Sequence, residues 1–157
     1  MISVVFRWKP LLVSILISLG AGGISALFTM NSMGIYESLN QPPLSPPSIV
    51  FPIVWTILYL LMGISAYLVY DSQSFLRKKA LILYGVQLVF NILWPLFFFN
   101  LQWFWFSFVW LSVLFALVLA MVAAFYQVNK TAALLQLPYL LWLVFAGYLN
   151  FMIALNN

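Results

Sequence analysis

The chain has 157 residues, of which 66% are hydrophobic and 5% are charged. A soluble domain of this size cannot bury so much apolar surface, so the composition excludes one and indicates an integral membrane protein. The formal net charge is +4, but six basic residues spread over short loops form no continuous patch, which argues against a nucleic-acid partner.

The charged residues divide the chain into apolar segments. A bilayer core about 30 Å thick needs roughly 20 helical residues for one crossing, and the uncharged segment 80–129 is long enough to cross, turn and cross back. We therefore predict one domain, 1–157, with the fold class of an all-α integral membrane protein, a single bundle of five transmembrane helices. The predicted helices cover about 10–30, 48–70, 80–99, 103–127 and 132–155, with a Pro-rich lid loop at about 31–47.

The N-terminal segment has an alternative interpretation. Arg7 and Lys9, followed by an apolar run and small residues, also fit a secretory signal. The run from Pro10 to about Phe28 is longer than a usual signal core, so we interpret it as the first helix.

The basic residues predict the orientation of the bundle. With five crossings, the N-terminus and the loops after the second and fourth helices share one side, and those three segments hold all six Lys and Arg. By the positive-inside rule, the N-terminus is cytoplasmic, and the C-terminus and the lid loop lie outside. We expect the cell (plasma) membrane as the location.

Small residues recur at every fourth position on two predicted helices. Such rows let helix backbones approach closely in lipid. They can pack within the chain or against a second subunit, and we expect packing within the chain. The rows are Ser14, Ser18, Gly22 and Ala26 on the first helix, and Ser112, Ala116, Ala120 and Ala124 on the fourth.

Bulky or polar side chains form a second kind of row. The rows are Phe51, Trp55, Tyr59 and Gly63; Gln87, Asn91, Trp94 and Phe98; and Pro138, Trp142 and Ala146. The aromatic residues fit either a lipid-facing surface or an interior wall. The amides of Gln87 and Asn91 need a partner inside the bundle, which is either a neighbouring helix or a ligand.

Several chemistries are disfavoured by what the chain lacks. No charged residue lies within a predicted span, which argues against ion-coupled pumps and against acid–base enzymes. Glu37 and Asp71 lie in loops on opposite sides of the membrane and cannot pair. Without cysteine or histidine, the commonest transition-metal ligands are missing, and we expect no metal site.

Three motifs occur in order along the chain: PPLSPPSIVFPIVWTILY within residues 41–70, NILW within 87–99, and PYLLWLVFAGYLN within 134–156. Together they resemble the TspO/MBR family, the tryptophan-rich sensory proteins, whose mitochondrial relatives are called translocator protein or peripheral-type benzodiazepine receptor. The resemblance implies a five-helix bundle, often a homodimer, with a pocket between the helices under the lid loop.

The resemblance also implies a ligand. Members bind protoporphyrin IX and related tetrapyrroles, and many bind isoquinoline or benzodiazepine drugs, so the expected partners are membrane lipid and a porphyrin-like small molecule, with no other cofactor. Gln87, from the amide row, is a further candidate to orient the ligand. The residues that match the pocket by position are Tyr36, Phe51, Trp55, Tyr59, Asn91, Trp94, Trp142, Phe145 and Ala146.

The resulting prediction is a membrane receptor or translocator-like sensor for porphyrins. One alternative is porphyrin degradation driven by light and oxygen at Trp55 and Trp142, which would make the protein an enzyme; another is a passive carrier of small apolar ligands. Leu44 departs from the family, because many relatives have Trp there. The sterol-recognition pattern of mitochondrial members is absent from the fifth helix, since no Lys or Arg follows Lys130.

Overall fold

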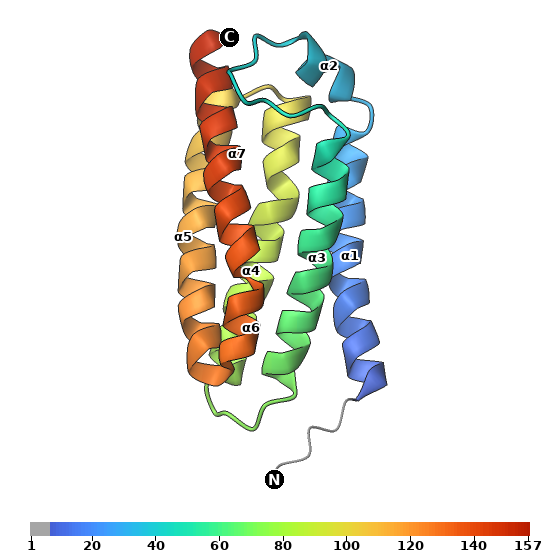
Figure 1. Cartoon of the computed structure of the whole chain (residues 1–157), viewed down its shortest axis with the longest axis vertical. Coiled ribbons are helices and arrows are strands. Elements are labelled where there is room, and N and C mark those ends of the chain that lie inside the picture. The colour runs from blue at the N-terminus through green and yellow to red at the C-terminus, as the bar shows by residue number, and fades with distance from the viewer. Residues whose placement is uncertain (1–6) are drawn as a thin grey trace.

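The computed structural model describes residues 7–157, and this part of the chain forms an all-helical bundle (Figure 1). Five of its helical stretches are long and apolar enough to cross a membrane, which confirms the predicted fold class. The first, second and fourth are α1 (Trp8–Thr29), α3 (Val50–Tyr70) and α5 (Phe104–Val128). The third is α4 (Arg77–Pro95) with a π-helical segment (Leu96–Asn100), and the fifth is α6 (Lys130–Leu135) with α7 (Leu137–Asn156).

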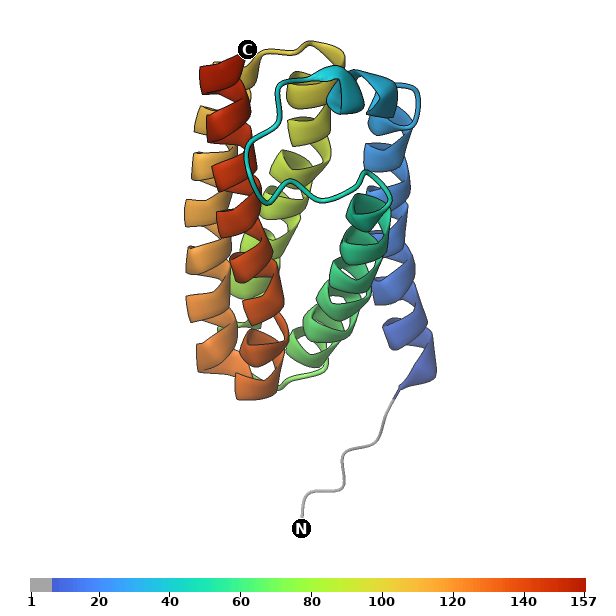
Figure 2. The same cartoon turned by 45° about the horizontal axis from the view of Figure 1, so that its top comes forward.

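The two ends of the bundle differ in charge. One end, here called the basic end, holds the starts of α1, α4 and α6 and with them every Lys and Arg of the chain. There Arg7 Nη2 lies 2.6 Å from Asp71 Oδ1, which raises the pKa of Arg7 and links the start of α1 to the end of α3. The other end, the lid end, carries the short helix α2 (Met33–Ser38), the loop to α3 and the C-terminus (Figures 1 and 2).

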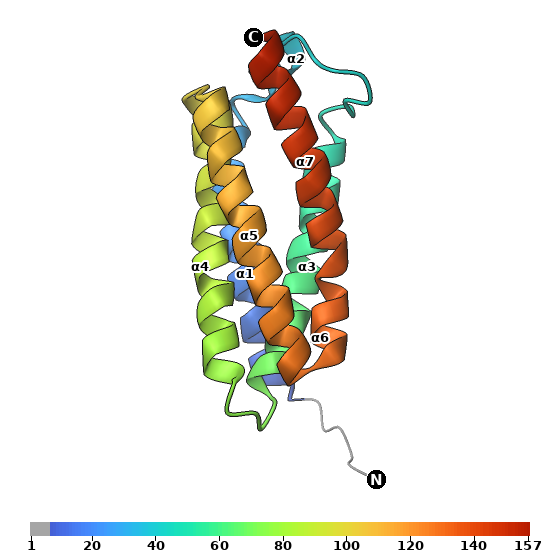
Figure 3. The ribbon, with the colours of Figure 1, turned by 90° about the vertical axis from the view of Figure 1, so that its left-hand side faces the viewer.

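The fifth span is divided where a single helix over 132–155 is predicted. Asn129 caps α6, and its Oδ1 accepts a hydrogen bond from the Ala132 amide at 3.0 Å. The break falls at Gln136, because Pro138 has no amide hydrogen and fits only the first turn of a new helix. α7 continues close to the line of α6 (Figure 3).

The third span ends in a widened turn where a regular helix to residue 99 is predicted. Pro95 donates no hydrogen bond, and the Leu101 amide bonds the Leu96 carbonyl, five residues back, at 3.0 Å. π-helical turns of this kind are frequent at functional sites. This one follows Trp94 and contains Phe99, both buried and both lining the cavity described below.

α1 and α3 pack tightly in the half nearer the basic end. Ser14 Oγ donates to the Gly63 carbonyl at 2.7 Å, and a Cβ built on Gly63 would lie 2.7 Å from Ile15 Cα. The predicted packing within the chain is thus confirmed for the part of the α1 row nearer the basic end, Ser14 and Ser18. For α5 that prediction is wrong, because its row faces outward, with these members exposed: Ser112, Ala116 and Ala120.

Candidate functional site

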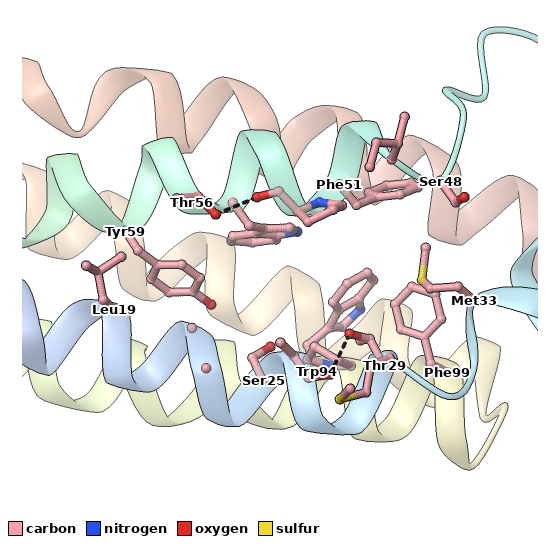
Figure 4. Close-up of a pocket in the computed structure, with 18 residues that line it drawn as sticks. Leu19, Ser25, Thr29, Met33, Ser48, Phe51, Thr56, Tyr59, Trp94 and Phe99 are labelled. Atoms are coloured by element: carbon pink, nitrogen blue, oxygen red, sulfur yellow. Dashed lines mark hydrogen bonds between the residues drawn. The ribbon is translucent and has the colours of Figure 1, made fainter.

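A cavity of about 510 Å³ opens between α1 and α3 in the half of the bundle nearer the lid end. This volume lies within the usual range for small-molecule sites, roughly 300–1,000 Å³. α1 forms one wall and α3 the other, and the Trp94 side chain, from the end of α4, lies between them (Figure 4). Among the residues that the structure describes, none that lines this cavity is charged.

The α3 wall is aromatic. Phe51, Trp55 and Tyr59 recur at every fourth position and therefore share one helix face. The rings of Trp55 and Tyr59 stack with centroids 5.7 Å apart and planes 29° apart. With Trp94 on α4, four of the predicted ligand-binding residues line this cavity.

The α1 wall is made of small residues, including Gly22, Gly23, Ser25 and Ala26. A Cβ on Gly22 would lie 2.6 Å from the ring of Tyr59, so glycine is needed for that ring to lie against α1. The sequence does not predict this wall as part of the site. The only signal for it is the row that contains Gly22 and Ala26, and small residues at this spacing predict a packing surface along the whole row.

The hydroxyl groups along the cavity mostly use their hydrogens within the protein. A hydroxyl has one hydrogen and two lone pairs, so one that has donated offers only an acceptor to a ligand. Two of these bonds are drawn in Figure 4. The donors are Thr29 to the Ala26 carbonyl at 3.1 Å, Thr56 to the Pro52 carbonyl at 2.6 Å, and Ser48 to Glu37 Oε1 at 2.8 Å.

A buried polar network lies next to the cavity, on the side of the basic end. The Tyr59 hydroxyl donates to Asn91 Oδ1, and Asn91 Nδ2 donates to the Tyr139 hydroxyl at 2.7 Å. Tyr139 donates in turn to Gln87 Oε1 at 2.8 Å. Asn91 and Gln87 are buried and do not line the cavity, so these two predicted ligand residues bond neighbouring helices instead.

Trp142 lies behind the α3 wall rather than on the cavity surface. Its ring meets Trp55 edge to face with centroids 6.3 Å apart, and meets Phe51 at 6.0 Å. Phe145 packs on Trp142 at 5.5 Å. The structure therefore arranges Trp142 and Phe145 as a second aromatic layer that supports the rings of α3.

Tyr36 and Ala146 line a separate space of only about 10 Å³, which has room for one water molecule. Tyr36 is 2% exposed, its ring packs edge to face on Phe51 at 5.1 Å, and its hydroxyl donates to the Pro46 carbonyl at 3.2 Å. Burial raises the pKa of Tyr36. The ring of Tyr36 fills the space under the lid, and the larger cavity opens beside it.

The lid is fastened to the C-terminal end of α7. Asn40 Nδ2 donates to the Asn156 carbonyl at 3.2 Å, and the Asn40 amide donates to Asn157 Oδ1 at 3.2 Å. The Tyr148 hydroxyl also donates to the Pro43 carbonyl at 2.8 Å. These bonds hold the loop across the bundle between α7 and α3 (Figure 2).

Substituting Asn157 with alanine tests this fastening. The change removes both bonds between the Asn157 side chain and the Asn40 backbone. Because a typical hydrogen bond contributes about 0.5–1.5 kcal/mol, losing two costs about 1–3 kcal/mol, and we expect lid amides in 39–49 to exchange hydrogen roughly five- to 150-fold faster. Gln73→Ala, in the loop at the basic end, is the control and should leave exchange at 39–49 unchanged. Equal rates in Asn157→Ala and the unmodified protein would contradict the role of these bonds.

Comparison with known proteins identifies the relatives of this bundle. A model of the TspO/MBR family matches residues 13–155. The chain belongs to the TspO/MBR family. It is 38% identical over 116 residues to the tryptophan-rich sensory protein of Cereibacter sphaeroides, covering 74% of this chain and 72% of the relative.

Other TspO/MBR relatives align over almost the whole chain. Identity to the translocator protein of Bos taurus is 34% over 155 residues, which covers 96% of this chain and 91% of the relative. Identity to the tryptophan-rich protein TspO of Archaeoglobus fulgidus is 35% over 148 residues, which covers 94% of this chain and 96% of the relative. The chain is accordingly an integral membrane protein of the TspO/MBR family.

Position 44, where many TspO/MBR proteins have Trp, adopts an unusual backbone. Leu44 has φ 72° and is 82% exposed, and the Ser45 amide bonds the Pro42 carbonyl at 3.3 Å to close a tight turn. A left-handed conformation costs a residue with a Cβ roughly 1–2 kcal/mol. With the Leu44 side chain exposed, the ring that the lid contributes to the interior is that of Tyr36.

Proposed function

We propose that this TspO/MBR protein is a membrane receptor or translocator-like sensor that binds a flat aromatic ligand of the porphyrin type, such as protoporphyrin IX, between α1 and α3. The observation that carries the proposal is the cavity of about 510 Å³ with an aromatic wall on one side and a wall of small residues on the other. Membership of a family that includes sensory and translocator proteins supports the same role.

The two walls suit a planar ligand for different reasons. The rings of Phe51, Trp55 and Tyr59 offer stacking surfaces, and an aromatic pair adds about 0.5–1.5 kcal/mol beyond the burial of its area. The Tyr59 ring occupies the space beside Gly22, but a Cβ on Gly23 would meet nothing within 4 Å, so a flat ring can approach the α1 backbone closely at Gly23. Apolar burial and stacking, rather than ion pairing, would then provide most of the affinity.

We further propose that the protein lies in the cell membrane with its basic end in the cytoplasm. The positive-inside rule supports this orientation, because all six Lys and Arg lie at that end. The lid and the cavity would then lie toward the outer leaflet.

Titration of the purified protein with protoporphyrin IX tests the proposal. Binding should quench tryptophan fluorescence and shift the Soret band of the porphyrin in a saturable way. Trp55→Phe should weaken binding roughly tenfold, since it removes the larger stacking surface from the cavity wall. Trp105→Phe is the matched control, because Trp105 is 52% exposed on α5 and lies outside the cavity. Absence of saturable binding would reject the proposal.

A second candidate function is oxidative degradation of the porphyrin in light and oxygen. It is favoured by the contact between Trp55, which lines the cavity, and Trp142 behind it, because both are oxidisable indoles. Loss of porphyrin absorbance over many turnovers, abolished in Trp55→Phe, would support this function. Bleaching that stops after one turnover, or that proceeds without the protein, would reject it.

A further inference from the structure

The charge nearest the cavity is negative. Glu37 belongs to α2, and its Oε1 accepts a hydrogen bond of 2.8 Å from Ser48 Oγ. Ser48 lines the cavity, as does Met33, which lies one helical turn before Glu37 on α2 (Figure 4). Glu37 is exposed, and no ion pair to it is found within residues 7–157. The carboxylate therefore lies one hydrogen bond away from the cavity lining, at the lid end, without a neutralising cation.

Positive charge is remote from Glu37 and from the cavity. Every Lys and Arg of the chain lies at the basic end. The 21 residues of α3 separate the two ends by about 30 Å, which is much too far for an ion pair with a ligand in the half of the bundle nearer the lid end. An anionic group on a ligand would thus meet Glu37 and no countercharge.

Three hydroxyl groups of the cavity lining point to the same preference. The hydroxyls of Thr29, Thr56 and Ser48 already donate to protein acceptors, so their lone pairs are what remains for a ligand. Lone pairs bind N–H donors and are repelled by carboxylate oxygens. The aromatic faces of Phe51 and Trp55 also attract cations.

We propose that this cavity selects its ligand by charge, taking neutral or cationic aromatic compounds in preference to anionic ones, with Glu37 as the specificity-determining residue. The inference rests on the proposed aromatic ligand site and adds the chemical class of the ligand. A porphyrin with esterified or amine-bearing side chains fits the site better than the dicarboxylic acid. A free acid binds with its carboxylates directed away from Glu37, into solvent.

Three porphyrins with the same ring test the inference: protoporphyrin IX, its dimethyl ester, and a derivative whose propionates are converted to amides ending in primary ammonium groups. Affinities are measured by tryptophan quenching in nanodiscs of zwitterionic phosphatidylcholine, at low and high salt. The ester and the ammonium derivative should bind more tightly than the free acid. Glu37→Gln keeps an acceptor for Ser48 and should tighten the free acid about two- to fivefold, as expected for one partly screened charge.

Glu37→Gln should also weaken binding of the ammonium derivative by a similar factor and leave the affinity for the ester unchanged. High salt should reduce both effects.

Asp71→Asn is the charge-matched control, because it removes one carboxylate at the basic end. All three affinities should be unchanged in this variant. If the three porphyrins bind but the free acid binds most tightly, or Glu37→Gln changes no affinity, charge selection is overturned while the aromatic site stands. If none binds, the proposed function fails and the inference fails with it.

Discussion

Replacing Gly63 with leucine is expected to lower the free energy of unfolding of the bundle by about 3 kcal/mol. Overpacking typically costs about 1–3 kcal/mol, and the upper value applies here because the contact is with backbone. A Cβ at Gly63 already meets Ile15 Cα and Ser18 Oγ at 2.7 Å, and the first of these is backbone that cannot rotate away. α1 must therefore move away from α3, which also breaks the bond from Ser14 to the Gly63 carbonyl. Thermal unfolding in detergent should show a midpoint lower by roughly 6–12 °C.

Gly85 provides the matched control for this substitution. It is exposed on α4, and a Cβ there would meet nothing within 4 Å. Gly85→Leu should melt at or slightly above the temperature of the unmodified protein, because leucine has the higher helix propensity. Equal melting of Gly63→Leu and Gly85→Leu would show that α1 does not depend on a close approach to α3.

Replacing Asn91 with leucine should cost about 1–3 kcal/mol. The change removes the acceptor of the buried Tyr59 hydroxyl, whereas the Tyr139 hydroxyl loses one donor and still donates to Gln87 Oε1. A buried polar group left without a partner costs about 1–3 kcal/mol. Since Tyr59 also forms part of the cavity wall, porphyrin affinity should fall together with thermal stability.

A double-mutant comparison separates this network from simple packing at Asn91. In a Tyr59→Phe background no hydroxyl is left without a partner, because Tyr139 still donates to Gln87, so Asn91→Leu should cost less than about 1 kcal/mol. The measurement is thermal unfolding of the four proteins, with and without the Tyr59 hydroxyl. A cost for Asn91→Leu that is the same in both backgrounds would contradict the hydrogen-bond explanation.

The shared face of the aromatic residues on α3 could be predicted from the sequence. The role of the polar residues Gln87 and Asn91 could not, because their amides fit either a ligand or a neighbouring helix. Residues four apart share a helix face in any fold, so Phe51, Trp55 and Tyr59 had to lie together. Whether Asn91 meets a ligand or a neighbouring helix depends on what faces it. The structure answers this with the hydroxyls of Tyr59 and Tyr139, which come from two other helices.

The role of the α1 wall also could not be predicted from the sequence alone. Small residues at four-residue spacing predict a surface that another helix can approach. In the structure, Ser14 meets α3 directly, while Gly22 and Ala26 line the cavity farther along the same face. α1 lies against α3 in the half nearer the basic end and separates from it in the half nearer the lid end, which decides which part of the row packs and which part lines the cavity. The sequence of one helix does not show where a neighbouring helix separates from it.

By itself, the sequence determined the five membrane spans and the gathering of all positive charge at one end. The spans can be predicted because backbone groups in lipid must form hydrogen bonds within their own helix, which requires long apolar helical segments. The side of each loop can be predicted because successive loops alternate between the two sides of the membrane. Only the tertiary structure decided where the helices separate to form a cavity and that Trp142 lies behind Trp55. It also decided that Glu37 is the charged residue that contacts the cavity lining, through Ser48. These relations join segments far apart in the chain, and they depend on how helix faces meet rather than on the pattern within any one helix.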